Sequence, residues 1–204
     1  MRSLIFALIF PLFSLSTATP AVAAQTVLVI GDSLSSGHGI RPEQSWPALL
    51  GKRLADQHSD YSVANVSISG DTTAGGRSRL PAALKEYHPA IVVIELGAND
   101  GLRGLPIPQI RENLNAMIDA SLAAKAKVLL IGMWLPPNYG AYADDFRQNF
   151  ADIARARRTA YLDFLLQPIA LQPAMFQADG THPVAEAQPV ILDHVWPRLA
   201  PLLK

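Results

Sequence analysis

The sequence contains no cysteine among its 204 residues. This absence excludes a disulfide framework, a thiol nucleophile and any metal site built on thiolate ligands. The chain also lacks a surplus of either charge, because 17 basic residues balance 17 acidic ones. We therefore expect no nucleic-acid partner, since such binding depends on basic residues that displace counterions from phosphates. Half of the residues are hydrophobic and 17% are charged, a composition that excludes a disordered chain.

The N-terminus has the pattern of an export signal. Arg2 is followed by an apolar run over residues 4–15, and small residues at 21–24 precede a cleavage position after Ala24. The apolar run is too short to anchor the chain across a bilayer. We therefore expect a signal peptide over residues 1–24, a periplasmic or secreted location and no stable membrane anchor. We expect the remaining residues, 25–204, to form a single domain that is monomeric.

Short apolar runs alternate with amphipathic stretches along the rest of the chain. Strands are predicted over residues 26–30, 61–68, 90–96, 127–132 and 160–165. Helices are predicted over residues 46–57, 75–87, 108–125, 142–158 and 184–199, with Ser45 as the N-cap of the first. Uninterrupted apolar strands suit a parallel sheet that is covered on both faces. With right-handed crossovers, the sequence predicts an α/β fold: a three-layer α/β/α, doubly wound, five-stranded parallel sheet.

Polar segments follow the predicted strands at the points where the strands end. They are Gly31–Leu34, Ser69–Thr72, Gly97–Asp100 and, near the C-terminus, Asp179–His182. Ligands of such sheets bind at the carboxyl ends of the strands, where the topology reverses. We therefore expect the four segments to converge on one edge of the sheet, although they span the whole chain.

Ser33 and His182 are the candidate nucleophile and base. Ser33 lies in a loop of small residues, where its hydroxyl can face a crevice, although Asp32 and Ser33 taken alone are more typical of a turn cap. Asp179 precedes His182 by three residues, so a tight turn can bring its carboxylate to the imidazole. Two ligands without a third make a metal site unconvincing. The other histidines are interpreted as surface, loop or structural residues: His38, His58, His88 and His194.

An acyl-transfer site also needs hydrogen-bond donors for the developing oxyanion. The Asn99 side chain, the Gly70 N–H and the Ser33 N–H are the candidates. Each of these residues taken singly fits a plain turn or bulge. Their occurrence together and in order, each at the end of a strand, favours a serine hydrolase in which Ser33, Asp179 and His182 form a triad.

These segments also resemble a known family. GDSL at 31–34, the glycine of SISGDT at 70, GAND at 97–100 and DGTH at 179–182 are similar to the four blocks of the SGNH (GDSL) hydrolases. The stretches ISGDTTAGGRSRLP, GANDGLRGLP and WLPPNYG resemble the exported bacterial esterases with thioesterase, arylesterase, protease-like and lysophospholipase activity. The resemblance implies a flavodoxin-like sheet, Asp179 as the triad acid, Gly70 and Asn99 in the oxyanion hole, and no metal or other cofactor. Ala98 is a minor departure, since members of that subgroup often have glycine there.

The sequence thus predicts a serine esterase that acts on small acyl esters or thioesters: aryl esters, acyl thioesters and lysophospholipids. The loop that contains Met133, Trp134, Leu135 and Pro136 offers apolar area for the acyl group, although Trp134 could equally serve to pack the loop. An O-acetylesterase acting on carbohydrate or peptidoglycan is an alternative, which the apolar loop does not favour. A non-catalytic binding module is another, against which the intact set of Ser, Gly, Asn and His argues.

Overall fold

The computed structural model of the chain describes residues 25–58 and 60–203, so the predicted signal peptide at 1–24 lies outside the described residues. The described chain folds around one parallel sheet with the strand order β2-β1-β3-β4-β5. The strands are β1 (Gln25–Gly31), β2 (Tyr61–Asn65), β3 (Ile91–Glu95), β4 (Lys127–Ile131) and β5 (Ala160–Leu162). The order reverses at β1, because β2 lies on one side of it and β3 on the other.

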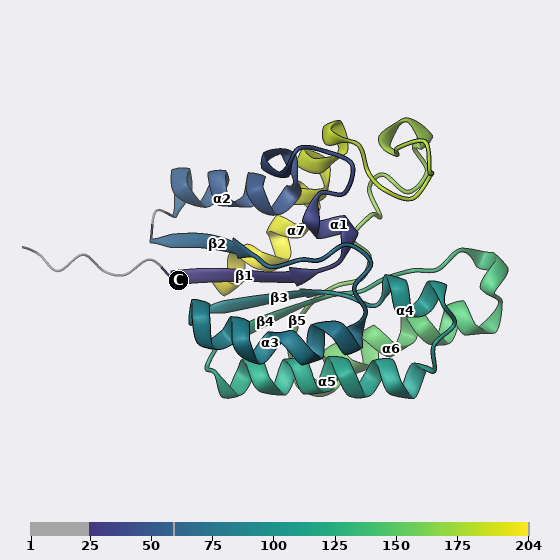
Figure 1. Ribbon diagram of the computed structural model, residues 1–204, viewed down its shortest axis with the longest axis horizontal. Coiled ribbons are helices and arrows are strands. Elements are labelled where there is room, and N and C mark those ends of the chain that lie inside the picture. The colour runs from purple at the N-terminus through teal and green to yellow at the C-terminus, as the bar shows by residue number, and fades with distance from the viewer. Residues whose placement is uncertain (1–24, 59, 204) are drawn as a thin grey trace, which may run out of the picture.

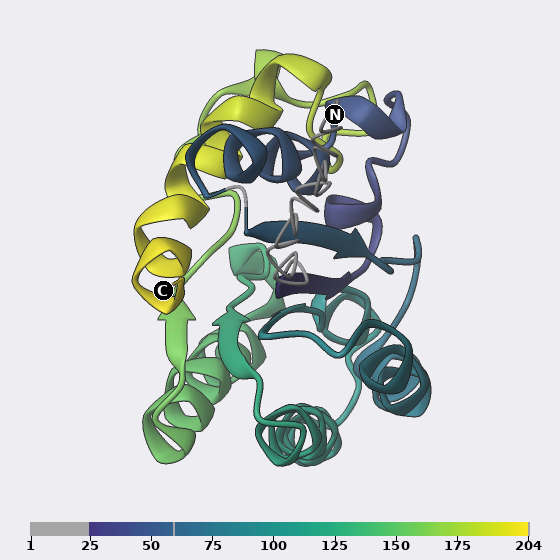
Figure 2. The same cartoon turned by 90° about the vertical axis from the view of Figure 1, so that its left-hand side faces the viewer.

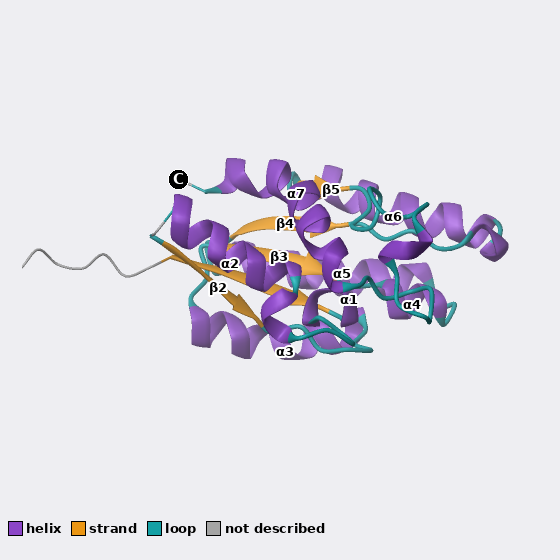
Figure 3. Cartoon of the chain, turned by 90° about the horizontal axis from the view of Figure 1, so that it is seen from above, coloured by secondary structure: helices purple, strands orange, loops and turns teal. Residues whose placement is uncertain are grey.

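Helices cover both faces of the sheet (Figure 1, Figure 2). One face carries α2 (Trp46–Gln57) and α7 (Gln188–Leu199), which lie across the strands when the molecule is seen from above (Figure 3). The other face carries α3 (Thr73–Tyr87), α5 (Ile107–Ala123) and α6 (Ala141–Arg157). The predicted three-layer, doubly wound fold is confirmed. Among the described residues, no helix has the length and apolar character needed to cross a membrane.

Two short helices escaped the sequence analysis. α1 (Ser33–Ser36) follows β1 after a single residue, and α4 (Ala98–Leu102) follows β3 closely. Both lie at the carboxyl edge of the sheet (Figure 1). Helices of four or five residues carry no amphipathic period, so pattern alone does not reveal them.

The core explains the apolar runs in the sequence. The side chains of Val27–Ile30 in β1 and Ile91–Ile94 in β3 are fully buried. Both strands lie in the interior of the sheet with helices on either face, so every position is covered and no alternation of polar residues is needed. Each such side chain contributes about 1.5–3 kcal/mol to folding.

Strand and helix ends differ from the predictions in ways that hydrogen bonds explain. The segment after β2 still runs beside β1, because the N–H groups of Val66 and Ile68 donate to the Val29 and Gly31 carbonyls, but its ladder ends at Asn65. β5 is only three residues long. The chain over 185–187 forms a 3-10 turn, so that α7 begins at Gln188 rather than at residue 184.

Ser45 is the N-cap residue of α2, as predicted, but its side chain does not make the capping hydrogen bond. The Ser45 hydroxyl donates backward to the Pro42 carbonyl at 2.8 Å and makes no cap bond. The Gln188 side chain accepts from the Trp46 N–H at 2.9 Å instead. A residue 142 positions away along the chain therefore satisfies one of the free N–H groups at the start of α2.

Candidate active site

The predicted nucleophile and one predicted donor lie at the point where the strand order reverses. Ser33 opens α1 directly after β1, and Asn99 lies in the first turn of α4 after β3. Because β1 and β3 are neighbours in the sheet, their carboxyl ends bring these two segments together. The predicted convergence of the strand ends is therefore observed for these two segments.

Ser33, His182 and Asp179 are joined in a line of hydrogen bonds. The Ser33 Oγ lies 2.9 Å from His182 Nε2, and His182 Nδ1 lies 2.7 Å from Asp179 Oδ2. The first of these contacts joins residues 149 positions apart along the chain. The three side chains are thus hydrogen-bonded in the order that a nucleophile, base and acid would require.

Hydrogen bonds within the turn that contains Asp179 keep its carboxyl group ionised. Asp179 Oδ1 accepts from the His182 N–H at 3.0 Å and from the Thr181 N–H at 2.8 Å. The His182 N–H, the His182 ring and the Thr181 N–H hold the pKa of Asp179 well below its usual range. A carboxylate that remains charged accepts a hydrogen from Nδ1. The Nε2 atom is then left as an acceptor, which is the form that can take a proton from the Ser33 hydroxyl.

Two backbone N–H groups are available as oxyanion donors. Among the described residues, neither the Ser33 N–H nor the Gly70 N–H donates a hydrogen bond. Gly70 has a φ of +79°, a conformation that favours glycine, and a Cβ built there would meet no atom within 4 Å. The side of Gly70 on which a Cβ would stand is therefore open.

Asn99 is held between the other two donor segments. Its Nδ2 donates to Asp32 Oδ2 at 3.0 Å and to the Asp71 carbonyl at 2.9 Å. These bonds tie Asn99 to Asp32, which precedes Ser33, and to Asp71, which follows Gly70. Both amide hydrogens are engaged, so Asn99 must redirect or share one of them before it can donate to an oxyanion.

Comparisons with known proteins place the chain in a family. The family model described as GDSL-like lipase/acylhydrolase matches residues 29–188, which include all four polar segments. This chain belongs to the GDSL-like lipase/acylhydrolase family.

Three relatives of this GDSL hydrolase carry functional names. The chain is 52% identical to esterase TesA of Pseudomonas aeruginosa, over 91% of this chain and 92% of that protein. It is 42% identical to an arylesterase of Vibrio mimicus (90% and 91%) and 41% identical to thioesterase 1/protease 1/lysophospholipase L1 of Escherichia coli (90% and 87%). A crystal structure of TesA aligns with a TM-score of 0.85 at 52% identity, over 88% of this chain and 100% of the other.

Two buried carboxyl groups of the GDSL hydrolase, those of Asp32 and Glu95, lie close to the segment that contains Ser33. Asp32 is fully buried and accepts from the Leu34 N–H at 3.0 Å, so it caps α1 in addition to holding Asn99. Burial raises the pKa of Asp32 to about 6. The sequence analysis treated this residue only as a turn cap.

Glu95, at the end of β3, was missed by the sequence analysis. Its Oε2 accepts from the Ser35 hydroxyl at 2.5 Å and from the Asp32 N–H at 3.3 Å, while its buried Oε1 has no partner among the described residues. Burial, and then the charge of Asp32, raise the pKa of Glu95 well above its usual value. A Cβ at Gly31 would lie 2.4 Å from Glu95 Oε2, so this approach requires glycine. The sequence did carry a signal for Glu95, because it is a charged residue in the otherwise apolar strand β3.

A second imidazole lies beside His182 in the GDSL hydrolase. The His38 ring centroid is 4.3 Å from that of His182, with the ring planes tilted by 41°. The Gln177 side chain donates to the His38 carbonyl at 2.8 Å and so ties this loop to the segment that contains Asp179 and His182. His194 contacts the Phe164 carbonyl at 3.0 Å, in keeping with the predicted structural role.

The predicted acyl-binding loop needs correction at Met133. This side chain is 2% exposed and packs in the core, where an acyl chain cannot reach it. Trp134 is enclosed on both faces, by the Arg147 guanidinium 3.9 Å from its ring centroid and by the Phe164 ring at 4.9 Å. Stacking therefore accounts for Trp134, and its ring faces are not free for a substrate.

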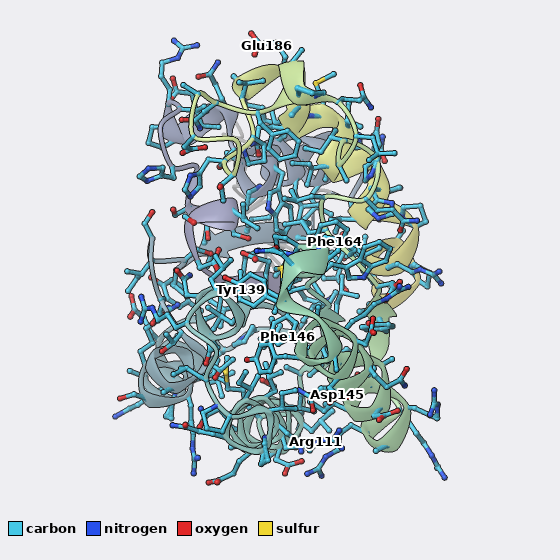
Figure 4. The ribbon with its side chains drawn as sticks, turned by 90° about the vertical axis from the view of Figure 1, so that its right-hand side faces the viewer. Arg111, Tyr139, Asp145, Phe146, Phe164 and Glu186 are labelled. Atoms are coloured by element: carbon cyan, nitrogen blue, oxygen red, sulfur yellow. The ribbon has the colours of Figure 1, made fainter. Side chains whose placement is uncertain are left out.

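Leu135 lines a depression at the carboxyl edge, the side shown in Figure 4 with Tyr139 and Phe164 labelled, and Pro136 precedes Pro137, another of its lining residues. Leu135 is partly buried and Pro136 is exposed. The depression has a volume of about 290 Å³ and is lined by Trp134, Leu135, Pro137, Gly140, Ala143, Asp144 and Arg147. Its lining is partly apolar, with one acidic and one basic side chain.

Proposed function

We propose that the protein is a serine esterase that hydrolyses carboxylic esters and thioesters through an acyl-enzyme on Ser33. The observation that carries this proposal is the line of hydrogen bonds from Ser33 Oγ through His182 to Asp179. The names of the relatives support aryl esters, acyl thioesters and lysophospholipids as substrate classes.

Acylation begins when His182 Nε2 takes the proton of the Ser33 hydroxyl as the oxygen attacks the acyl carbonyl carbon. Negative charge then develops on the former carbonyl oxygen. The N–H groups of Ser33 and Gly70 stabilise this charge, and Asn99 adds its amide as it releases one of its present acceptors. Such donors act because they favour the transition state over the bound substrate.

The tetrahedral intermediate collapses as His182 passes the proton to the leaving alcohol or thiol. Water then attacks the acyl-enzyme with His182 again as base, and Ser33 recovers its proton when the carboxylic acid leaves. Asp179 accepts from Nδ1 throughout, orients the ring and stabilises the imidazolium. These steps use only side chains and backbone groups of the chain.

The acyl group is proposed to lie toward the depression beside Leu135 and Pro136, without contact to Met133. We also propose that the enzyme is exported, on the strength of the N-terminal pattern at 1–24, and that it works as a monomer. N-terminal sequencing of protein recovered from the periplasm or the medium tests this: a chain that begins at residue 25 is expected, and an uncleaved chain confined to the cytoplasm contradicts it.

The activity is tested by steady-state kinetics with a p-nitrophenyl ester, an acyl thioester and a lysophospholipid. Ser33→Ala is expected to lower kcat by about 10⁴-fold or more on every substrate that the native protein cleaves. Ser36→Ala is the matched control, because it removes a serine hydroxyl from the opposite end of the same short helix. Activity that survives Ser33→Ala, or native protein that cleaves none of the three substrates, contradicts the proposal.

A further inference from the structure

Arg79, in the middle of α3, contacts three segments that surround the candidate site. Its Nη2 donates to the Gly31 carbonyl at 3.2 Å, its Nη1 to the Val66 carbonyl, and its Nε to Asp71 Oδ2 at 2.7 Å. The Arg79 side chain is 22% exposed and that of Asp71 only 12%, so this ion pair is largely sheltered from water.

Each of these acceptors lies close along the chain to a proposed oxyanion donor. Gly31 ends β1 and directly precedes the Asp32–Ser33 pair. Val66 belongs to the segment that runs from β2 to the turn at Gly70. Asp71 follows Gly70, and its carbonyl accepts from the Asn99 side chain at 2.9 Å. One guanidinium therefore links the backbone around all three donors.

The surroundings of Asp71 leave its carboxylate little freedom. Asp71 Oδ1 accepts from the Thr72 N–H at 2.9 Å. A Cβ at Gly75 would lie 1.9 Å from the same oxygen, so the carboxylate occupies space that only glycine leaves free. Arg79 holds the other oxygen. The side chain is thus fixed on both sides, and the turn that contains Gly70 is fixed with it.

Arginine suits this task for a geometric reason. Its guanidinium is planar, always charged and carries five N–H donors in a rigid fork, so that three nitrogens can address three acceptors at once. A lysine ammonium is a compact charge on a flexible stem and cannot reach three separated acceptors in a plane. We therefore expect lysine to keep the charge at this position but to lose the alignment.

We propose that Arg79 is a positioning residue for the oxyanion hole. It acts through Gly31, Val66 and Asp71 and fixes the direction in which the Gly70 N–H and the Asn99 amide point. This inference rests on the proposed esterase function. Donors that are misplaced weaken the transition state more than substrate binding, because the charge they stabilise develops only during the reaction. Loss of Arg79 therefore lowers kcat and leaves KM nearly unchanged.

The experiment compares Arg79→Ala and Arg79→Lys with Arg111→Ala. Arg111 is an arginine of α5 whose ion pair with Asp152 is 3.7 Å long and roughly half exposed, and it lies at the periphery of the molecule in Figure 4. Its removal reports the general effect of losing a surface arginine. Kinetics with a p-nitrophenyl ester are measured at a temperature at which circular dichroism shows each variant folded.

We expect both Arg79 variants to lose about 100-fold or more in kcat, with KM within about twofold of the native value. Added methylguanidinium is expected to restore part of kcat to Arg79→Ala and none to Arg111→Ala. Rescue of this kind, like the separation of kcat from KM, distinguishes positioning from a role confined to stability. If Arg79→Ala does not fold, Arg79→Lys, which keeps the charge, decides the question.

A folded Arg79→Lys or Arg79→Ala with kcat within about threefold of the native enzyme overturns the inference. So does an effect on KM alone, or an equal loss in Arg111→Ala. In these cases the native enzyme remains active and the proposed function stands. If the native protein cleaves no ester or thioester, the proposed function fails, and this inference fails with it.

Discussion

Substitution of Gly70 by alanine tests whether the Gly70 N–H is an oxyanion donor. The φ of +79° places this residue in the left-handed region, where a side chain costs about 1 kcal/mol. A Cβ there meets no atom within 4 Å, so no clash adds to this cost. For a chain of this size we expect a fall in Tm of about 2–4 °C. Relief of the strain rotates the peptide that carries the N–H, and loss of one oxyanion donor costs about 3–4 kcal/mol in the transition state. We therefore expect kcat to fall by about 10²–10³-fold.

Gly104→Ala is the matched control for this prediction. Gly104 has a φ of +63°, and a Cβ there also meets no atom within 4 Å. The two variants therefore carry the same backbone strain, but only Gly70 contributes a proposed donor. Esterase assays and thermal unfolding of both variants give the comparison. Similar Tm values together with a Gly70→Ala kcat within about threefold of that of Gly104→Ala would refute the reasoning.

Three further predictions follow from the triad, the buried carboxyl groups and the corrected loop. Asp179→Asn removes the charge that holds the Nδ1 hydrogen, so kcat is expected to fall by about 10⁴-fold with little change in folding. Because the pKa of Asp179 is held low, its carboxylate stays charged throughout the mildly acidic and neutral range, so protonation of Asp179 does not contribute to this difference at pH 8. Native and variant kcat values that agree within about threefold in steady-state assays at pH 8 contradict the prediction. The pKa of Glu95 is raised above its usual value of 4.5, so the folded state retains a proton that the unfolded chain releases, and the free energy of unfolding falls as pH rises above that value. Glu95→Gln should remove this contribution, up to about 1.4 kcal/mol per pH unit, in urea titrations at several pH values; equal slopes for both proteins contradict the prediction. Met133→Ala should lower the free energy of unfolding by about 2–5 kcal/mol and leave the preference among acyl-chain lengths unchanged, whereas a shifted preference would restore Met133 to the substrate site.

Local features of the site were predictable from the sequence. Asp179 and His182 are three residues apart in a turn, so their contact needs no knowledge of the tertiary fold. Ser33 and Asn99 each follow an apolar strand, and the topology of parallel sheets brings such strand ends together. The fold class was predictable as well, because uninterrupted apolar strands suit a parallel sheet that helices cover on both faces.

Other contacts between distant segments were not predictable. Arg77 and Arg79 look alike in the sequence of α3, yet Arg77 pairs with the exposed Glu112 while Arg79 reaches Gly31 and Asp71. The cap that Gln188 provides to α2 depends on how α7 packs against α2. His38 meets His182 only because its loop bends through glycines at 37 and 39, both with positive φ.

The error at Met133 has a simple origin. An apolar run after a strand looks the same whether its side chains line a crevice or continue the core. Met133 points into the core, and the next residue, Trp134, is enclosed by Arg147 and Phe164 from α6 and the segment after β5. Neither arginine nor phenylalanine is near the loop in sequence, so this packing was not visible there.

Labelling with a fluorophosphonate, followed by mapping of the modified peptide, tests the central claim most directly. The account predicts one covalent adduct on the Ser33 oxygen, formed far more slowly in His182→Ala because the hydroxyl then has no base. An adduct on a different residue, or an unlabelled Ser33 in protein that actively hydrolyses esters, would contradict it.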